Sequence, residues 1–165
     1  MARLLVVHHS PTAAVRVLLD AVLDGSHDPA LDGVDVSAVP ALDVTADDVL
    51  AADGYILGTP ANFGYMSGAL KHFFDSTFLD IGGALDDKGG AGESAGATAK
   101  RPFGLFVHGR YDTTGAVRSV LSIVQALGWR QVHDVVEVMG DVDERHTAAA
   151  YELGATVAAN ILEGT

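Results

Sequence analysis

The sequence contains no cysteine, and this absence removes several chemistries at once. The chain can form no disulfide, no thiolate nucleophile, and no zinc or iron–sulfur site built on sulfur ligands. Basic residues are also scarce, since 10 Lys and Arg stand against 22 Asp and Glu, for a formal net charge of −12. Nucleic acids and anionic membranes favour the opposite sign, so we expect no nucleic-acid partner, while a basic protein partner fits this charge.

Long hydrophobic runs are missing as well. No run approaches the roughly 18 apolar residues of a membrane-spanning helix, so we expect no membrane span. The apolar run at residues 4–7 is too short for a signal peptide and is followed by two histidines, which favours a cytoplasmic protein. With 165 residues, of which 48% are hydrophobic and 19% charged, we expect residues 1–165 to form a single globular domain.

Five strand-like runs alternate with helix-like patterns. The runs lie at residues 4–7, 34–39, 55–58, 103–107 and 132–138, and the helical patterns at about 12–23, 67–78, 117–127 and 147–162. Such alternation is typical of βαβ units and a mostly parallel sheet. The first, third and fourth runs are apolar on both faces and suit the centre, while polar residues place the second and fifth at the edges. Right-handed crossovers then predict an α/β fold: a three-layer α/β/α sandwich with a five-stranded parallel sheet in the order 2-1-3-4-5.

One segment, residues 82–100, breaks this alternation because it is rich in Gly and Ala. We expect a mobile loop there, and a lid over a ligand is the functional alternative. The segment contains Gly92-Glu93-Ser94-Ala95-Gly96, which matches the G-x-S-x-G pattern of a hydrolase nucleophile elbow. No apolar strand precedes the match and no helical pattern follows it, so we interpret it as a chance match.

Familiar phosphate-binding and metal-binding patterns are absent. Neither GxxxxGK[ST] nor GxGxxG occurs, which argues against a P-loop and the usual dinucleotide fingerprint. His8 and His9 point to opposite faces of a strand, so they do not share an ion, and we expect His8 to be a core histidine. His9 and His108 end strands that lie ~10 Å apart, and Asp112 would be a third ligand. No closely spaced ligand pattern supports this arrangement, and we predict no metal site.

The loops after the first, third and fourth runs converge at the carboxyl edge of the sheet, where the strand order reverses and a crevice opens. Residues 59–66 and 108–115 form two of these loops and combine turn-forming residues with aromatic side chains. A planar, partly polar ligand suits this mixture. For Phe63 and Met66 the alternative is packing against neighbouring helices.

The stretch ADGYILGTPANFGYMSGALKHFFD, residues 52–75, resembles the flavin-loop segment of flavodoxin-like FMN proteins. These include the NAD(P)H-dependent FMN reductases and the quinone reductases of the tryptophan-repressor-binding-protein type. The shared pattern is an apolar strand, a G-[ST]-P loop, a Gly, and a helix with a GALK-like start. The matching positions are Gly58, Thr59, Pro60, Gly64, Gly68, Ala69, Leu70, Lys71 and Phe74. In topology the resemblance covers nearly the whole chain and implies a flavodoxin-like fold.

The resemblance implies that the first loop binds the phosphate of a noncovalently held FMN. In that family the loop is similar to S-x-T-G-N-T, and this chain keeps Ser10 and Thr12 but has Ala-Ala-Val in place of Gly-Asn-Thr. Backbone N–H groups at a helix N-terminus bind phosphate whatever the side chains are. His9 is a hypothetical additional donor. The implied phosphate site consists of His9, Ser10, Thr12, Ala13, Ala14 and Val15.

The same resemblance implies where the flavin ring and its ribityl chain lie. The implied contacts are Thr59, Pro60, Ala61, Asn62, Phe63 and Gly64 on one side, and His108, Gly109, Arg110 and Tyr111 on the other. As candidate catalytic residues, His108 and Tyr111 would donate a proton to a reduced acceptor. Trp129 falls at the opposite end of the sheet, so we expect it to be structural.

The implied function is an FMN-binding oxidoreductase that transfers electrons from NADH or NADPH to a quinone-like or other small acceptor. One alternative is an electron carrier of the flavodoxin kind, whose acidic surface docks a redox partner protein. A second is a flavin-free binding or regulatory relative, which the altered phosphate loop makes worth testing. The resemblance also implies a homodimer or tetramer in which subunits complete each other's sites.

Overall fold

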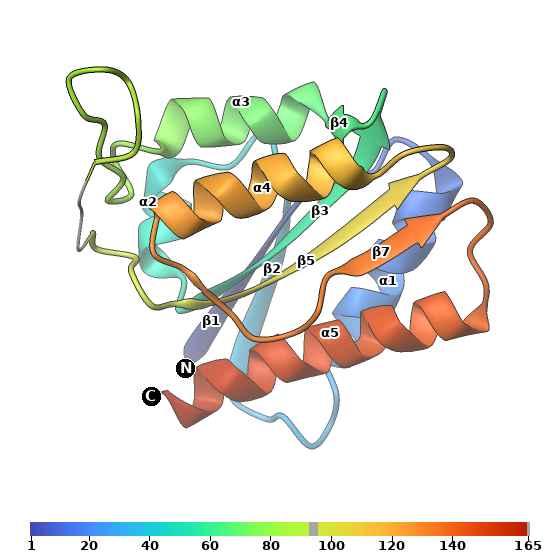
Figure 1. Cartoon of the computed structure of the whole chain (residues 1–165). Coiled ribbons are helices and arrows are strands. Elements are labelled where there is room, and N and C mark those ends of the chain that lie inside the picture. The colour runs from blue at the N-terminus through green and yellow to red at the C-terminus, as the bar shows by residue number, and fades with distance from the viewer. Residues whose placement is uncertain (93–95, 165) are drawn as a thin grey trace.

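The fold is built on a central β-sheet. The computed structural model describes residues 1–92 and 96–164 of the chain. The elements are β1 (Ala2–His8), α1 (Ala13–Ser26), β2 (Val34–Pro40), α2 (Ala46–Ala51), β3 (Gly54–Asn62), β4 (Tyr65–Met66), α3 (Gly68–Thr77), β5 (Pro102–Gly109), α4 (Thr114–Ala126), β6 (Arg130–Gln131), β7 (Val136–Met139) and α5 (Glu144–Glu163) (Figure 1). The strands β2, β1, β3 and β5 pair in that order and in parallel, and β6 and β7 both pair with β5. The predicted order 2-1-3-4-5 is confirmed, with β6 and β7 sharing the fifth position.

Helices cover both faces of the sheet, as predicted for a three-layer sandwich. In Figure 1, α3 and α4 lie above the sheet with α2 at one side, and α1 and α5 lie below it. The alternation along β1 divides its side chains between the two layers, since Leu5 and Val7 join the core under α2, α3 and α4. Leu4 and Val6 join the core under α1 and α5. Residue parity on a strand therefore tells which helices a side chain meets.

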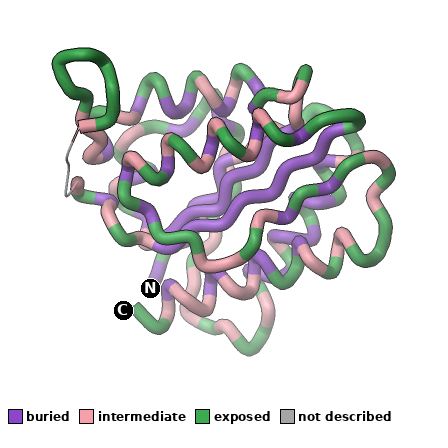
Figure 2. Tube along the Cα trace, viewed as in Figure 1, coloured by how far each residue is buried: buried purple, intermediate pink, exposed green. Residues whose placement is uncertain are grey.

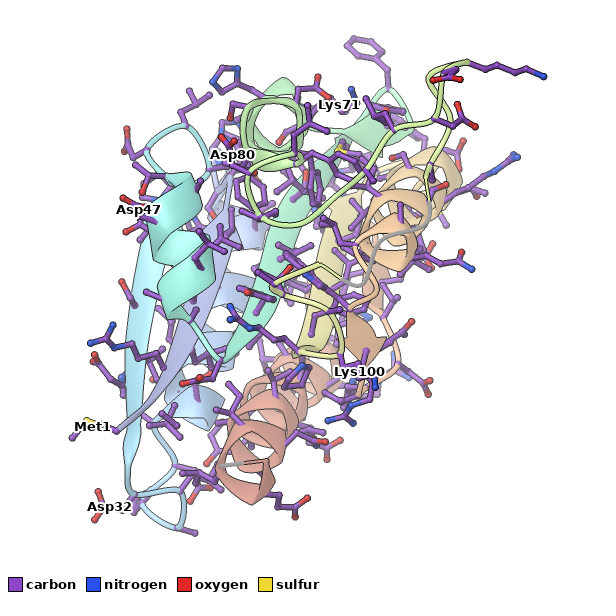
Figure 3. The ribbon with its side chains drawn as sticks, turned by 90° about the vertical axis from the view of Figure 1, so that its left-hand side faces the viewer. Met1, Asp32, Asp47, Lys71, Asp80 and Lys100 are labelled. Carbon is purple, nitrogen blue, oxygen red and sulfur yellow. The ribbon has the colours of Figure 1, made fainter. Side chains whose placement is uncertain are left out.

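The burial of the strands follows the polarity of the sequence (Figure 2). Every residue of β5 is buried, and so is β3 from Gly54 to Pro60, as expected for central parallel strands. In contrast, β2 at the edge has no fully buried residue. Figure 3 shows Asp32 and Asp47 on the outside of the ribbon, and Asp32, Asp47 and Asp80 are all exposed.

The fifth run is not the continuous strand over 132–138 that the sequence predicts. It begins earlier, at Arg130, stops after Gln131 and resumes at Val136. Between the pairs Phe103↔Gln131 and Phe106↔Val136, the edge advances five residues while β5 advances three. Two extra residues therefore bulge out of the ladder, which an edge strand tolerates because its outer side has no partner strand.

The two helices below the sheet touch through glycine. A Cβ on Gly154 of α5 would lie 2.1 Å from the backbone oxygen of Val22, and one on Gly25 of α1 would lie 2.0 Å from that of Tyr151. Only glycine permits this approach of the two backbones. The crossing fixes α1 against α5 and thereby fixes the position of the α1 N-terminus at the carboxyl edge of the sheet.

Local signals predict some helix ends and miss one helix. Ser67 caps α3 as expected, because its Oγ accepts from the backbone N–H of Leu70 at 3.1 Å. Gly128 follows α4 with φ of +72°, which agrees with its predicted place just past the helix end. The short α2 was not expected, although Thr45 and Asp48 form a capping box at its start.

In the described part of residues 82–100, residues 85–91 are exposed, whereas Thr98 packs at the amino end of the sheet. Thr98 is buried, and its hydroxyl donates to the carbonyl of Ile81 at 2.8 Å and accepts from the indole N–H of Trp129 at 2.9 Å. Trp129 is therefore structural at that end, as predicted. Residues 93–95 of the G-x-S-x-G match lie outside the described residues. Within the described ranges, no helix has both the length and the hydropathy to cross a membrane.

Candidate functional site

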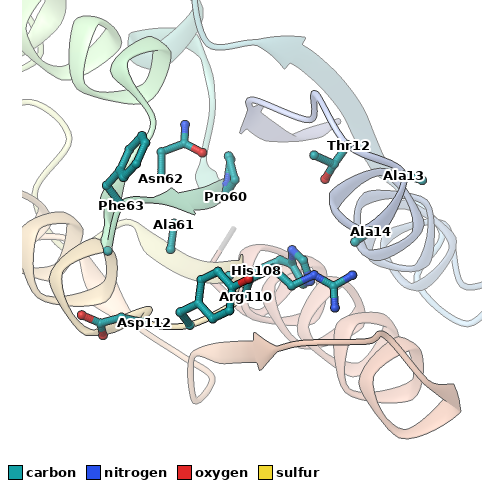
Figure 4. Close-up of a pocket in the computed structure, with 13 residues that line it drawn as sticks. Thr12, Ala13, Ala14, Pro60, Ala61, Asn62, Phe63, His108, Arg110 and Asp112 are labelled. Atoms are coloured by element: carbon teal, nitrogen blue, oxygen red, sulfur yellow. The ribbon is translucent and has the colours of Figure 1, made fainter.

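A cavity of about 640 Å³ opens at the carboxyl edge of the sheet, at the predicted crevice (Figure 4). Three segments surround it: the start of α1, the hairpin of β3 and β4, and the loop from β5 to α4. The lining residues are Thr12, Ala13, Ala14, Pro60, Ala61, Asn62, Phe63, Gly64, His108, Gly109, Arg110, Tyr111 and Asp112. Twelve of them belong to the site implied by the resemblance, and Asp112 is the addition. The described residues of 82–100 are not among them, which argues against the lid interpretation.

The segment predicted as a loop at residues 59–66 is instead a hairpin. β3 continues to Asn62, and β4 pairs back through Asn62↔Tyr65 and Ala61↔Met66. The two turn residues, Phe63 and Gly64, have positive φ values of 51° and 79°, the combination that a two-residue type I′ turn requires.

The turn costs strain because a bulky residue disfavours positive φ. Phe63 is nevertheless fully exposed at the cavity mouth, so packing does not compensate for this strain. Met66, in contrast, is buried in the core, so the packing alternative holds for Met66 and not for Phe63.

Thr59 anchors the base of this hairpin and does not line the cavity. Its buried hydroxyl donates to the carbonyl of Pro60 at 2.8 Å and accepts from the backbone N–H of Ser67 at 3.0 Å. Ser67 in turn caps α3. These bonds hold Pro60 and Ala61 against the cavity, so Thr59 contributes to the site through the geometry of the hairpin.

The start of α1 forms the opposite end of the cavity. Thr12 caps the helix, and its Oγ1 accepts from the backbone N–H of Val15 at 3.4 Å. Thr12, Ala13 and Ala14 line the cavity, and the first N–H groups of a helix have no carbonyl partner within it. No acidic residue occupies the first turn, so the positive end of the helix dipole faces the cavity unopposed. The side chain of Val15 lies in the core under α1 and α5.

Two further residues of the implied phosphate site, His9 and Ser10, are partly buried beside the cavity without lining it. The backbone N–H of His9 donates to the carbonyl of Gly58 at 3.0 Å, which ties the loop to β3. Ser10 Oγ lies 3.0 Å from Nδ1 of His8. Burial of His8, together with the neighbouring His9, lowers the pKa of the His8 imidazole.

On the β5 side, His108 is held in a single orientation. It is 8% exposed, and its Nε2 donates to the carbonyl of Gly140 at 2.7 Å. A carbonyl only accepts, so Nε2 carries the proton and Nδ1 of the neutral ring is an acceptor. The neutral ring therefore has no further proton to donate. The backbone N–H of Gly140 also donates to Gly109 at 2.8 Å, so the loop after β7 supports this wall of the cavity.

The charged residues of the cavity come from the loop after β5. Arg110 forms an exposed ion pair of 2.9 Å with Asp141, and Tyr111 is 92% exposed. Asp112 accepts from the backbone N–H of Thr114 at 2.9 Å, and this bond, with a second from the Thr114 hydroxyl, lowers the pKa of its carboxyl. From the sequence, Asp112 belongs to the predicted loop 108–115 and is named individually only as a metal ligand. In residues 1–92 and 96–164, no three His, Asp or Glu side chains converge in a way that would hold a metal ion.

Comparison with known proteins points in one direction. The family model described as NADPH-dependent FMN reductase matches residues 24–141, well over half of the chain. A flavodoxin from Aquifex aeolicus is 33% identical over 88 residues, which cover 53% of this chain and 46% of that protein. An NAD(P)H dehydrogenase (quinone) from Syntrophobacter fumaroxidans is 46% identical over 48 residues, covering 28% of this chain and 24% of the relative. The chain thus spans less than half the length of these relatives.

Solved structures agree over the whole chain. A flavodoxin of Streptococcus pneumonia TIGR4 superposes with a TM-score of 0.74 at 21% identity, covering 96% of this chain and 99% of that one. A WrbA-like flavodoxin from Agrobacterium tumefaciens has a TM-score of 0.73 at 17% identity, with both chains covered completely, at 100% each. These likenesses establish the fold, and the family match adds to it. The chain has the flavodoxin-like fold and belongs to the NADPH-dependent FMN reductase family.

Proposed function

We propose that the protein is an FMN-dependent oxidoreductase that transfers electrons from NADPH or NADH to a quinone-like or other small acceptor. The observation that carries the proposal is the cavity itself. It joins a helix N-terminus, suited to a phosphate, to walls of backbone and aromatic groups, suited to a flat ring.

The phosphate end fits FMN. Thr12, Ala13 and Ala14 at the start of α1 line the cavity, and the first turn brings no carboxylate. Thr12, Ala13 and Ala14 would hold the phosphate there. Arg16 stabilises the loop, because its guanidinium donates to the carbonyls of Ser10 and Pro11 at 3.4 and 3.1 Å.

The other end fits the ring. The volume of about 640 Å³ lies within the ~300–1,000 Å³ of small-molecule sites. Pro60, Ala61 and Asn62 would border the ring on the β3 side, and His108 and Gly109 on the β5 side. Bound FMN would supply the redox chemistry, because the side chains of this chain offer no electron carrier of their own.

The protein's part in the reaction is to bind, to orient and to move a proton. The hairpin anchored by Thr59 and the ring of His108 bonded to Gly140 keep the walls in register with α1. Tyr111 projects its phenol at the open mouth, where it could protonate a reduced acceptor. His108 would act as a hydrogen-bond acceptor through Nδ1 in its neutral form, and it becomes a proton donor only when that nitrogen is also protonated.

The test begins with the visible spectrum of the purified protein, before and after addition of FMN. We expect a flavin spectrum after reconstitution, bleaching under anaerobic NADPH or NADH, and recovery of the colour when a quinone is added. A matched pair of variants, Thr12→Val and Thr12→Ser, separates loss of the hydroxyl from change of shape. A protein that never takes up FMN would contradict the proposal.

The second candidate is an electron carrier, and two observations favour it. The flavodoxin from Aquifex aeolicus is 33% identical over its matched segment, and the net charge of −12 would attract a basic redox partner. FMN-loaded protein that ignores both nicotinamide nucleotides but exchanges electrons with a basic redox protein would support the carrier. Protein that binds no flavin would support the flavin-free relative. A dimer or tetramer stays a prediction, to be measured by light scattering.

A further inference from the structure

His8 is the one member of the histidine pair that contacts a proposed phosphate ligand through its side chain. It ends β1, where its backbone neighbours are Pro40 on β2 and Gly58 on β3. It lies on the same face as Val6, towards α1 and α5, and is partly buried. From there its Nδ1 reaches Ser10 Oγ at 3.0 Å, in the turn that leads into α1.

The protonation of His8 Nδ1 decides whether the hydroxyl proton of Ser10 is used in this contact or is free for another acceptor. A serine hydroxyl has one proton to donate. When Nδ1 of His8 is bare, Ser10 donates that proton to His8 and turns only lone pairs towards any anion. When Nδ1 carries a proton, His8 donates to Ser10 Oγ, and the hydroxyl proton is free to point elsewhere.

We propose that His8 is a positioning residue whose neutral ring carries its proton on Nε2, so that only the charged ring donates from Nδ1 to Ser10 and frees the Ser10 hydroxyl to donate to the FMN phosphate. FMN then binds more tightly when His8 is charged. The inference rests on the FMN function proposed above and adds a pH dependence to its cofactor site. The positive charge on His8 would also attract the phosphate.

The composition of the loop gives this contact its weight. Ala13 and Ala14 stand where donor-bearing side chains would be useful, and they offer only backbone N–H groups. Thr12 supplies one hydroxyl. The guanidinium of Arg16 is directed to the carbonyls of Ser10 and Pro11. Ser10 does not line the cavity, but it stands two residues before Thr12, which does, so its hydroxyl would be the next side-chain donor of the loop for a phosphate at the start of α1.

The charged groups around His8 are few. Pro40 and Gly58 on the flanking strands have no charge. At this edge of the sheet, the charged or titratable groups of the surrounding elements are His9 beside it, Arg16 on α1, His108 two strands away, and Glu144, Arg145 and His146 at the start of α5. Asp20 and Asp24 on α1, Tyr151, Glu152 and Glu163 on α5, and Arg3 and Asp35 on β1 and β2 stand further towards the amino end. Of these, Arg16 is bonded to loop carbonyls, His108 to Gly140, and His146 to Asp143.

Burial and His9 lower the pKa of His8, which favours its neutral form in the free protein and moves its protonation to lower pH. A bound phosphate would raise that pKa, because binding and protonation strengthen each other by the same factor. Relative to a variant without the imidazole, FMN affinity should therefore increase as the pH falls.

The experiment measures FMN dissociation constants by quenching of flavin fluorescence, from about pH 5 to about pH 8, for the wild type and His8→Asn. His8→Asn keeps a hydrogen-bonding group near the position of Nδ1 but does not titrate. The phosphate of FMN itself titrates near pH ~6, and this titration is common to the measurements on the wild type and the variant. We expect the affinity advantage of the wild type to grow about tenfold from high to low pH, as for a hydrogen bond to a charged group. Riboflavin, which lacks the phosphate, should show no such change.

Ser10→Ala and the double variant His8→Asn/Ser10→Ala complete a cycle. In the Ser10→Ala background, the His8→Asn substitution should change the pH dependence of FMN affinity only a little. In Ser10→Thr, most of the tenfold pH effect should return. The imidazole pKa of His8, followed by NMR, should rise when FMN binds. A wild-type advantage that is flat with pH, or equal for riboflavin, would overturn the inference while leaving FMN binding intact. Failure of every protein to bind FMN would overturn both this inference and the proposed function.

Discussion

The two ends of the sheet treat their polar groups in opposite ways. At the amino end, the phenol of Tyr55 donates to the carbonyl of Val49 at 2.8 Å and accepts from Arg101 at 2.8 Å, while its ring stacks on Trp129 with centroids 4.0 Å apart. The same guanidinium nitrogen lies 2.7 Å from the carbonyl of Ala52. Here the chain satisfies its own donors and acceptors.

At the carboxyl end, backbone donors and aromatic rings lie at a cavity instead. The first N–H groups of α1 face a cavity, and Phe63 and Tyr111 are almost fully exposed at its mouth. One end of the sheet thus contributes stability and the other keeps binding capacity, and mutations should separate the two.

The largest effect is expected from Trp129→Ala. It removes a buried ring that stacks on Tyr55 and leaves Thr98 without its indole donor, so we expect a loss of about 3–5 kcal/mol in the free energy of unfolding. Denaturant unfolding measures it. FMN affinity of the folded variant should be unchanged, and a large loss of affinity would mean that the two ends are coupled.

The next effect is a loss of stability in alkali. Burial raises the pKa of Tyr55 to about 12, despite the bond from Arg101 that lowers it. In the unfolded chain the phenol ionises near pH ~10, so the stabilisation is complete below pH ~10 and is lost as the pH rises towards about 12. The loss amounts to roughly 3 kcal/mol. Tyr55→Phe should remove this part of the pH dependence of unfolding, and an unaltered profile would refute the assignment.

A smaller effect separates the binding end. Thr12→Val removes the hydroxyl of a residue that lines the cavity and should weaken FMN binding about tenfold, as expected for one bond to a charged group. The lost cap should cost about 1 kcal/mol of stability. Thr12→Ser is the control that keeps both. Equal FMN affinity in Thr12→Val and Thr12→Ser would remove Thr12 from the phosphate site.

The smallest effect has the opposite sign. Phe63→Asn puts a residue that tolerates positive φ into the first turn position, before Gly64, and should raise stability by about 1 kcal/mol. The exposed ring is lost, so we expect a higher KM for a quinone acceptor in steady-state assays. Stability and KM that both stay constant would show that Phe63 is neither strained nor used.

Much of the fold was predictable from the sequence because strand polarity reports position in a parallel sheet. The apolar run at 103–107 became the fully buried β5, and the polar run at 34–39 became the edge strand β2. The prediction of a continuous strand over residues 132–138 was wrong, because a bulge in an edge strand does not alter the alternation of polar and apolar residues along it. The short α2 buries only Val49, too little for a helical period to be visible.

Prediction of the site depended on a different signal. The predicted strand order already brought the loops after the first, third and fourth runs to one crevice, and the resemblance over residues 52–75 added the ligand. Neither carried information on which side chains point into the cavity. Thr59 and Val15 do not point into the cavity, because the Thr59 hydroxyl is bonded at the base of the hairpin and Val15 packs in the core under α1 and α5. The role of Arg101 was invisible in the sequence, since its partners lie 46 to 52 residues away.

The anchoring of the hairpin by Thr59 and Ser67 has an evolutionary consequence. The base of the hairpin is bonded to β3 and α3, whereas the tip residues Asn62 and Phe63 make no contribution to the core. Substitutions at the tip should therefore change the mouth of the cavity without disturbing the core, provided that position 63 keeps a residue that tolerates positive φ. If the proposed function holds, a library randomised at these two positions would test whether the cavity mouth sets the choice of acceptor while the core stays intact.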